Sequence, residues 1–130
     1  MASDMGGMTD TSTLGSPDAR LATIARLNDR CRQGLDRTAR IGITRACLGT
    51  FAENRAAEIV AKAGILAALR GYRFSEAEAG ERDRGSFDYR GTTVYFRIEY
   101  YDAALEYGSE DPADASITRR VLTIMLREDL

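Results

Sequence analysis

The residues with the clearest potential for chemistry lie in one acidic segment near the C-terminal end. From position 99 to position 114 the sequence holds six acidic residues and no basic one. They are Glu99, Asp102, Glu106, Glu110, Asp111 and Asp114. Carboxylate oxygens are the ligands that Mg²⁺ and Ca²⁺ prefer, but the spacing is not that of an EF-hand and lacks its turn glycine. Three interpretations stay open: a metal site, a partner-binding loop, or a solvated connection whose turns are set by its aspartates.

The chain contains no histidine. This excludes Ser-His-Asp and Cys-His catalysis and the common zinc sites with histidine ligands. Acid–base catalysis at neutral pH would need a shifted carboxylate, a tyrosine, a cysteine or Lys62. Ser109, after Gly108, is of the nucleophile type, yet the sequence places no base beside it. A hydroxyl bonded to its own turn is the favoured interpretation of Ser109.

Two tyrosines flank the acidic residues, and tyrosine beside charge is typical of protein interfaces. We therefore predict a partner-binding surface made of Tyr101, Asp102, Tyr107, Glu110 and Asp111. Its excess of negative charge predicts a protein partner with a basic surface. No residue pattern indicates a cofactor, and a homodimer stays open.

Composition narrows the class of protein. The chain has 130 residues, 44% of them apolar, and a formal net charge of −2, which fits one folded domain and argues against direct nucleic-acid binding. There is no apolar run long enough for a membrane span, and Met1 to Ser16 lack the features of a secretory signal. Cys31 and Cys47 have no framework spacing, which predicts free, buried thiols in the cytoplasm.

Helical signals frame the first half of the chain. Residues 1–15 have too few large apolar side chains to fold, so we expect a disordered tail followed by a single domain over 16–130. Ser16-Pro17-Asp18 predicts a helix start, and Gly34 its end. The apolar positions of this helix, with one polar residue among them, are Leu21, Ile24, Ala25, Asn28 and Cys31.

A short strand over 39–45 and a second helix over 51–70 follow. The capping-box spacing of Thr50 and Glu53 predicts where this helix starts, and Gly71 where it ends. One apolar face recurs at helical spacing. It consists of Ala56, Ile59, Val60, Ala63, Leu66 and Ala67.

The second half of the sequence has the alternating pattern that predicts strands. Residues 86–89 and 92–101 alternate around Arg90-Gly91, which predicts a two-residue hairpin with Tyr89 opposite Thr92. Residues 118–127 predict a central strand, because both alternating faces are apolar. The order α-β-α-β-β-β predicts an α+β fold with a four-stranded, mainly antiparallel sheet and two helices packed on one face.

Arginines on the predicted strands are a further candidate group. Arg119-Arg120, Arg97 and Arg84 can form a basic stripe across neighbouring strands. Pairing with acids such as Glu99 is the favoured interpretation, and a clamp for a carboxylate or phosphate is the alternative.

Several runs resemble an uncharacterised bacterial family, domain of unknown function thirty-seven sixty-eight. They are Tyr100-Tyr101-Asp102, the stretch from Tyr107 to Asp114, and the stretch from Thr118 to Leu126. The resemblance covers about residues 20–128 and implies a short bacterial protein often carried on mobile elements, with no assigned activity. Where the family often has histidine and an aromatic residue in its loop motif, this chain has Arg82 and Arg84.

Together these features favour a non-enzymatic interaction protein that binds and modulates a larger protein. An inhibitor of a host defence system, such as an anti-CRISPR or antirestriction protein, fits the mobile-element setting by analogy. The alternative is a histidine-free enzyme, dependent on carboxylates or a metal, that uses Asp102, Glu110 and Asp111.

Overall fold

The four strands form one mixed sheet in the order β1-β4-β3-β2. The computed structural model describes residues 16–130, so the tail predicted for residues 1–15 lies outside the described residues. The elements are α2 (Pro17–Arg32), β1 (Arg40–Ile43), α3 (Arg45–Phe51), α4 (Arg55–Arg70), β2 (Arg84–Tyr89), β3 (Thr92–Tyr101) and β4 (Arg119–Met125), with short 3-10 turns at Glu76–Glu78 and Arg127–Asp129.

The predicted α+β class and four-stranded sheet are confirmed. The β2–β3 and β3–β4 pairs are antiparallel, as expected, but β1 pairs with β4 in parallel. Parallel strands need a long connection, and here α3, α4 and the β2–β3 hairpin all lie between the two partners. The prediction that the last strand is central is confirmed, since β4 lies between β1 and β3.

The hairpin between β2 and β3 turns where the sequence predicted. Arg90 and Gly91 both have positive φ, 48° and 83°, as a two-residue primed turn requires. Tyr89 is opposite Thr92 in the register. Every second residue of β3 then points to the helices, so Val94, Phe96 and Ile98 are buried.

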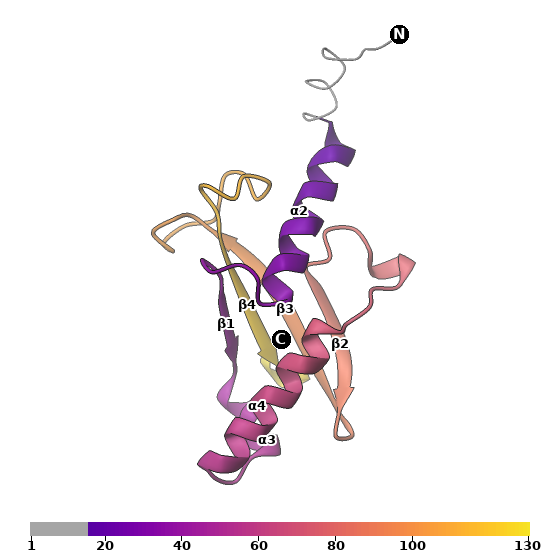
Figure 1. Cartoon of the computed structure of the whole chain (residues 1–130), viewed down its shortest axis with the longest axis vertical. Coiled ribbons are helices and arrows are strands. Elements are labelled where there is room, and N and C mark those ends of the chain that lie inside the picture. Colours follow the sequence, from indigo (N-terminus) through magenta and orange to yellow (C-terminus); the bar gives the residue numbers. More distant parts are fainter. Residues whose placement is uncertain (1–15) are drawn as a thin grey trace.

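Helices α2 and α4 lie over one face of the sheet, with α3 at the end of the molecule beside α4 (Figure 1). The core between these layers is made of Cys31, Cys47, Ile65, Leu69, Val94, Phe96, Ile98, Leu122, Ile124 and Leu126. The prediction of free, buried cysteines is confirmed. Burial raises the pKa of the Cys31 thiol to about 12, so this thiol stays protonated at neutral pH.

The helix predicted over 51–70 begins only at Arg55, and an additional helix, α3, precedes it over Arg45–Phe51, which is a correction. Thr44 caps α3, its hydroxyl accepting from the Cys47 amide at 3.2 Å, and Asn54 caps α4, its side chain accepting from the Ala57 amide at 2.8 Å. The predicted cap, Thr50, instead donates to the Ala46 carbonyl inside α3. The structure thus has three α-helices among residues 16–130 rather than two.

Most of the apolar face predicted for α4 does not meet the sheet: of its six residues, Leu66 packs against the core and the other five are exposed. The face that does carries Ala61, Ile65 and Leu69, all fully buried. Ile59 and Val60, from the predicted face, are 64% and 59% exposed. Because α4 has apolar residues on two opposite sides, the 3.6-residue period does not reveal which side is covered.

Gly64 of α4 is required by packing against the hairpin. A Cβ atom at Gly64 would lie 2.9 Å from Tyr89 Cε1. We expect Gly64→Ala to lower the free energy of unfolding by about 1–2 kcal/mol, because overpacking outweighs the gain in helix propensity. The matched control is Gly49→Ala in α3, where a Cβ meets nothing within 4 Å and a gain of up to about 1 kcal/mol is expected. Urea denaturation of both variants measures the difference, and a stabilised Gly64→Ala would contradict this packing.

Candidate functional site

The candidate site is the connection between β3 and β4, residues 102–118, called here the β3–β4 loop. Its first part is a tight turn: the Asp102 amide donates to the Tyr107 carbonyl at 2.8 Å, and Asp102 Oδ1 accepts from the Glu106 amide at 3.0 Å. Tyr101 forms an isolated bridge with Gly108 that closes the turn. The turn leaves Tyr107 73% exposed.

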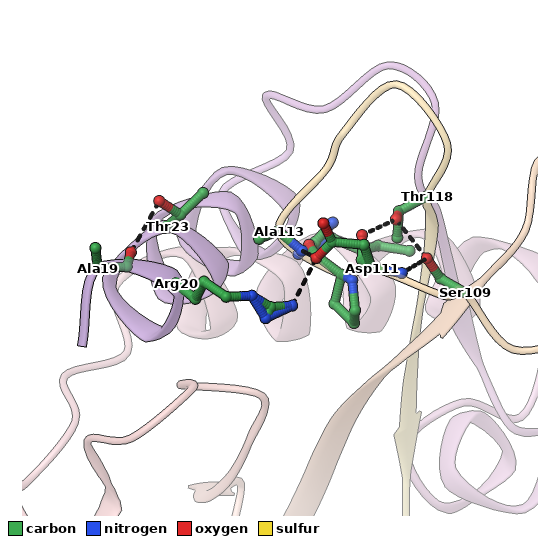
Figure 2. A network of polar contacts seen from close by, with 9 residues as sticks. Ala19, Arg20, Thr23, Ser109, Asp111, Ala113 and Thr118 are labelled. Carbon is green, nitrogen blue, oxygen red and sulfur yellow. Dashed lines mark hydrogen bonds and ion pairs between the residues drawn. The ribbon is translucent and has the colours of Figure 1, made fainter. Parts of the chain in front are cut away.

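Asp111 fixes the second part of the loop to helix α2. Its Oδ1 accepts from Arg20 at 2.6 Å and from the Ala113 amide at 3.1 Å (Figure 2). Arg20 comes from α2, and its side chain is 39% exposed. The acidic segment 99–114 contains no basic residue of its own, but Asp111 has a basic partner that is distant in the sequence.

Hydroxyl groups lock the same part of the loop from the other side. Thr118 Oγ1 donates to the Asp111 carbonyl at 2.8 Å, and Ser109 Oγ lies 2.7 Å from Thr118 Oγ1 (Figure 2). Since Thr118 has one hydroxyl proton, Ser109 donates to it and accepts from the Asp111 amide at 3.2 Å. The predicted role of Ser109 as a turn hydroxyl is confirmed.

Thr118 offers a direct test of this lock. It is 2% exposed, so Thr118→Val keeps the shape while leaving the Asp111 carbonyl and the Ser109 hydroxyl without their partner. We expect a loss of about 1–3 kcal/mol in unfolding free energy. Amide hydrogen exchange over 109–117 should also become faster. Thr93→Val, at an exposed position of β3, is the control, and equal exchange in both variants would contradict the lock.

The surface left open by these contacts is a shallow hollow beside the tight turn. It has a volume of about 460 Å³ and is lined by Asp102, Ala103, Tyr107, Gly108, Glu110, Ser116 and Ile117. Among residues 16–130, no arginine or lysine forms an ion pair with Glu106 or Glu110. The hollow therefore presents an aromatic ring, an aliphatic side chain and negative charge on a fixed backbone.

The structure brings three of the five predicted site residues together. Asp102, Tyr107 and Glu110 all line the hollow. Asp111 instead forms an ion pair with Arg20 of α2. Tyr101 lies on the sheet face away from the helices, where it is the cross-strand partner of Arg119.

Two of the three carboxylates named for a metal-dependent enzyme have structural partners, whereas Glu110 has no ion-pair partner within residues 16–130. Asp102 accepts from the backbone of its own turn, and Asp111 from Arg20 and the Ala113 amide. Across residues 16–130 no three acids or cysteines lie together in a way that would hold a metal ion. No helix in this same range is long and apolar enough to span a membrane.

A buried arginine holds the base of the loop. Arg120 is 2% exposed and donates from Nε to Asn28 Oδ1 and from one terminal nitrogen to the Pro112 carbonyl, both at 2.6 Å. Its guanidinium also lies over the Tyr100 ring, 5.0 Å from the centroid. Burial lowers the pKa of Arg120 below its usual range. This one side chain thus joins β4 to α2 and to the β3–β4 loop.

The same network reaches the loop before β2. Tyr100 donates its hydroxyl to Glu81 Oε1 at 2.6 Å and accepts from Asn28 Nδ2 at 2.7 Å. Burial, and then the bond to Glu81, raises the pKa of Tyr100. Sequence reasoning placed Asn28 on the buried helix face but missed its partners, because a polar residue among apolar ones was the only signal.

The basic stripe predicted across the strands is divided between the two faces of the sheet. Arg120 points to the helices and is buried, whereas Arg84 and Arg97 are cross-strand partners on the other face. Arg97 Nε lies 3.8 Å from Glu99 Oε1, but both residues are on β3, so this is a pair within one strand and not the cross-strand pairing that was favoured. Strand alternation separates Arg120 from its neighbour Arg119, so the four arginines do not form one clamp.

These features define a small α+β protein whose β3–β4 loop is fixed on two sides and presents an acidic, aromatic hollow. The chain belongs to the family described as Protein of unknown function (DUF3768), whose model matches residues 52–129, more than half of the chain. The match begins later than the expected residue 20. No curated protein matches the chain, and no solved structure does.

The family match includes the hollow but not α2. Arg20 and Asn28, which anchor the loop and Arg120, therefore lie outside the matched residues. Arg82, where the resemblance implies histidine, pairs with Asp29 of α2 at 3.0 Å. This ion pair supplies a further contact between the loop before β2 and α2.

Proposed function

We propose that this protein is a non-enzymatic binding module that uses the hollow of the β3–β4 loop to bind a larger protein. The observation that carries the proposal is the pair Tyr107 and Glu110. Both are exposed, both line the hollow, and Glu110 has no ion-pair partner within residues 16–130. The lock around Asp111 supports it, because a fixed loop loses little conformational entropy on binding.

The charge of the hollow indicates the partner. Glu110 in the hollow, and the exposed Glu106 next to Tyr107, would be complemented by a basic surface, and Tyr107 by an apolar depression within it. We propose a cytoplasmic protein that modulates such a partner. An inhibitor of a host defence system, of the anti-CRISPR or antirestriction type, would meet basic nucleic-acid-binding surfaces of this kind. With a net charge of −2, the protein fits recognition of one basic patch better than mimicry of a whole nucleic acid.

Affinity capture from host cells tests the proposal. The baits are the full chain and the double variant Tyr107→Ser/Glu110→Gln, in which both substituted side chains are exposed, so folding should be unaffected. Leu35→Ser/Glu53→Gln is the matched control, since it also removes one exposed large side chain and one exposed acid. We expect a protein that co-purifies with the full chain and the control but not with the double variant. Equal capture by all three baits would contradict the proposal.

A further inference from the structure

Helix α4 has an uncovered apolar side, opposite the side that packs on the sheet. Its residues recur at positions i, i+3, i+4, i+7 and i+11 and are all exposed. They are Ala56, Ile59, Val60, Ala63 and Ala67, called here the outer stripe. The opposite side carries Ala61, Ile65 and Leu69 and is fully buried. A helix that is apolar on both sides is normally buried on both.

The outer stripe is bordered by positive charge. Arg55, Lys62 and Arg70 are exposed and lie along it. None of the three has an ion-pair partner within residues 16–130. The only acid of α4, Glu58, is half-buried and lines two hollows beside Leu48, one of them together with Arg55, Ile59 and Lys62, so three exposed cations outnumber one half-buried acid. The exposed border of the stripe is therefore basic.

We propose that the outer stripe docks an amphipathic helix of another protein, whose apolar side is flanked by acidic residues. The alanines allow the two helix backbones to approach closely, and Ile59 and Val60 provide ridges that fit the grooves of the facing helix. Acidic flanks on that helix would pair with Arg55, Lys62 and Arg70. This surface lies on α4, apart from the loop residues of the hollow, so it is independent of the proposed function.

Two other occupants fit the stripe less well. A second copy of this chain, packed antiparallel along the stripe, would bring Arg55 of one copy near Arg70 of the other, which are like charges. An anionic membrane would attract the cations, but it is usually entered by Trp, Phe or Leu, and three of the five stripe residues are alanine. An acidic helix satisfies both the charge and the small side chains.

A displayed library of helical peptides tests the charge requirement. Peptides of about 18 residues carry a fixed leucine stripe, and their flanking positions vary among Glu, Gln and Lys. Peptides are selected on the full chain, and the enrichment of each is compared with its enrichment on the double variant Ile59→Ser/Val60→Ser. Both substituted positions are exposed, so the core of the variant stays intact. We expect glutamate-flanked peptides to be enriched and to bind the double variant about 10-fold or more weakly by fluorescence anisotropy.

Enrichment of lysine-flanked peptides, or of none above the double variant, would overturn the proposal. Two further results would overturn the proposal in favour of the other occupants. One is that sedimentation velocity finds a dimer of the full chain but not of the double variant. The other is cosedimentation with vesicles of phosphatidylglycerol and phosphatidylcholine that the double variant loses. Leu35→Ser, which replaces an exposed aliphatic side chain outside α4, is the control in every arm.

Discussion

Replacing Arg120 with methionine is expected to lower the free energy of unfolding by about 3–5 kcal/mol. The change keeps most of the side-chain volume but removes both donors. Asn28 Oδ1 and the Pro112 carbonyl then lose partners that lie 2.6 Å away. Relief of the buried charge offsets part of this loss, but Asn28 is fully buried and no solvent reaches its orphaned oxygen.

The control for this prediction is the neighbouring position on the other face of β4. Arg119 is half-buried and donates only to the Thr118 carbonyl, at 3.3 Å. We expect Arg119→Met to change unfolding free energy by less than about 1 kcal/mol. Chemical denaturation of both variants gives the comparison. Equal stability of the two variants would mean that the buried network does not hold α2 and the loop to the sheet.

Truncating Ile124 to alanine is expected to cost about 2–5 kcal/mol. Ile124 is fully buried on β4, the strand between β1 and β3, and it pairs with Ile43 on one side and Phe96 on the other. Removing its methyl groups leaves a cavity that neither neighbour can fill without moving the sheet. The cost therefore includes a cavity term beyond the lost transfer free energy.

Thr123→Ala is the control, because Thr123 is adjacent on the same strand but points to the uncovered face. A change of less than about 1 kcal/mol is expected there. The denaturation midpoints of both variants, at equal slopes, measure the difference. An unchanged midpoint for Ile124→Ala would contradict the order of the strands and the position of the core.

Local features of the fold were predictable and distant ones were not. The hairpin followed from alternation around Arg90-Gly91, and the start of α2 from Ser16, whose side chain accepts from the Ala19 amide at 3.1 Å. The parallel β1–β4 pair was missed, since the partners of Arg40 lie some eighty residues later, at Val121. Strand periodicity reports which residues share a face, not which strand lies beside it.

The site was predictable in composition but not in its contacts. The sequence shows an acidic segment with Tyr107, and the structure brings Tyr107 and Glu110 to one hollow. The sequence does not show that Asp111 pairs with Arg20, because helix α2 reaches the loop only in the folded chain. Helix α4 has apolar residues on two opposite sides, and the sequence does not show which side packs on the sheet.

If the hollow of the β3–β4 loop binds a basic partner, the exposed carboxylates should speed association electrostatically. The most direct test is the association rate of the captured partner, measured by stopped-flow from about 50 to about 500 mM NaCl. The full chain is compared with Glu106→Gln/Glu110→Gln, which removes two exposed charges without ion-pair partners in residues 16–130 and keeps the loop contacts. We expect an association rate that falls steeply with salt for the full chain, and a slower rate with a flatter salt dependence for the variant. Identical rates and identical salt slopes would contradict it.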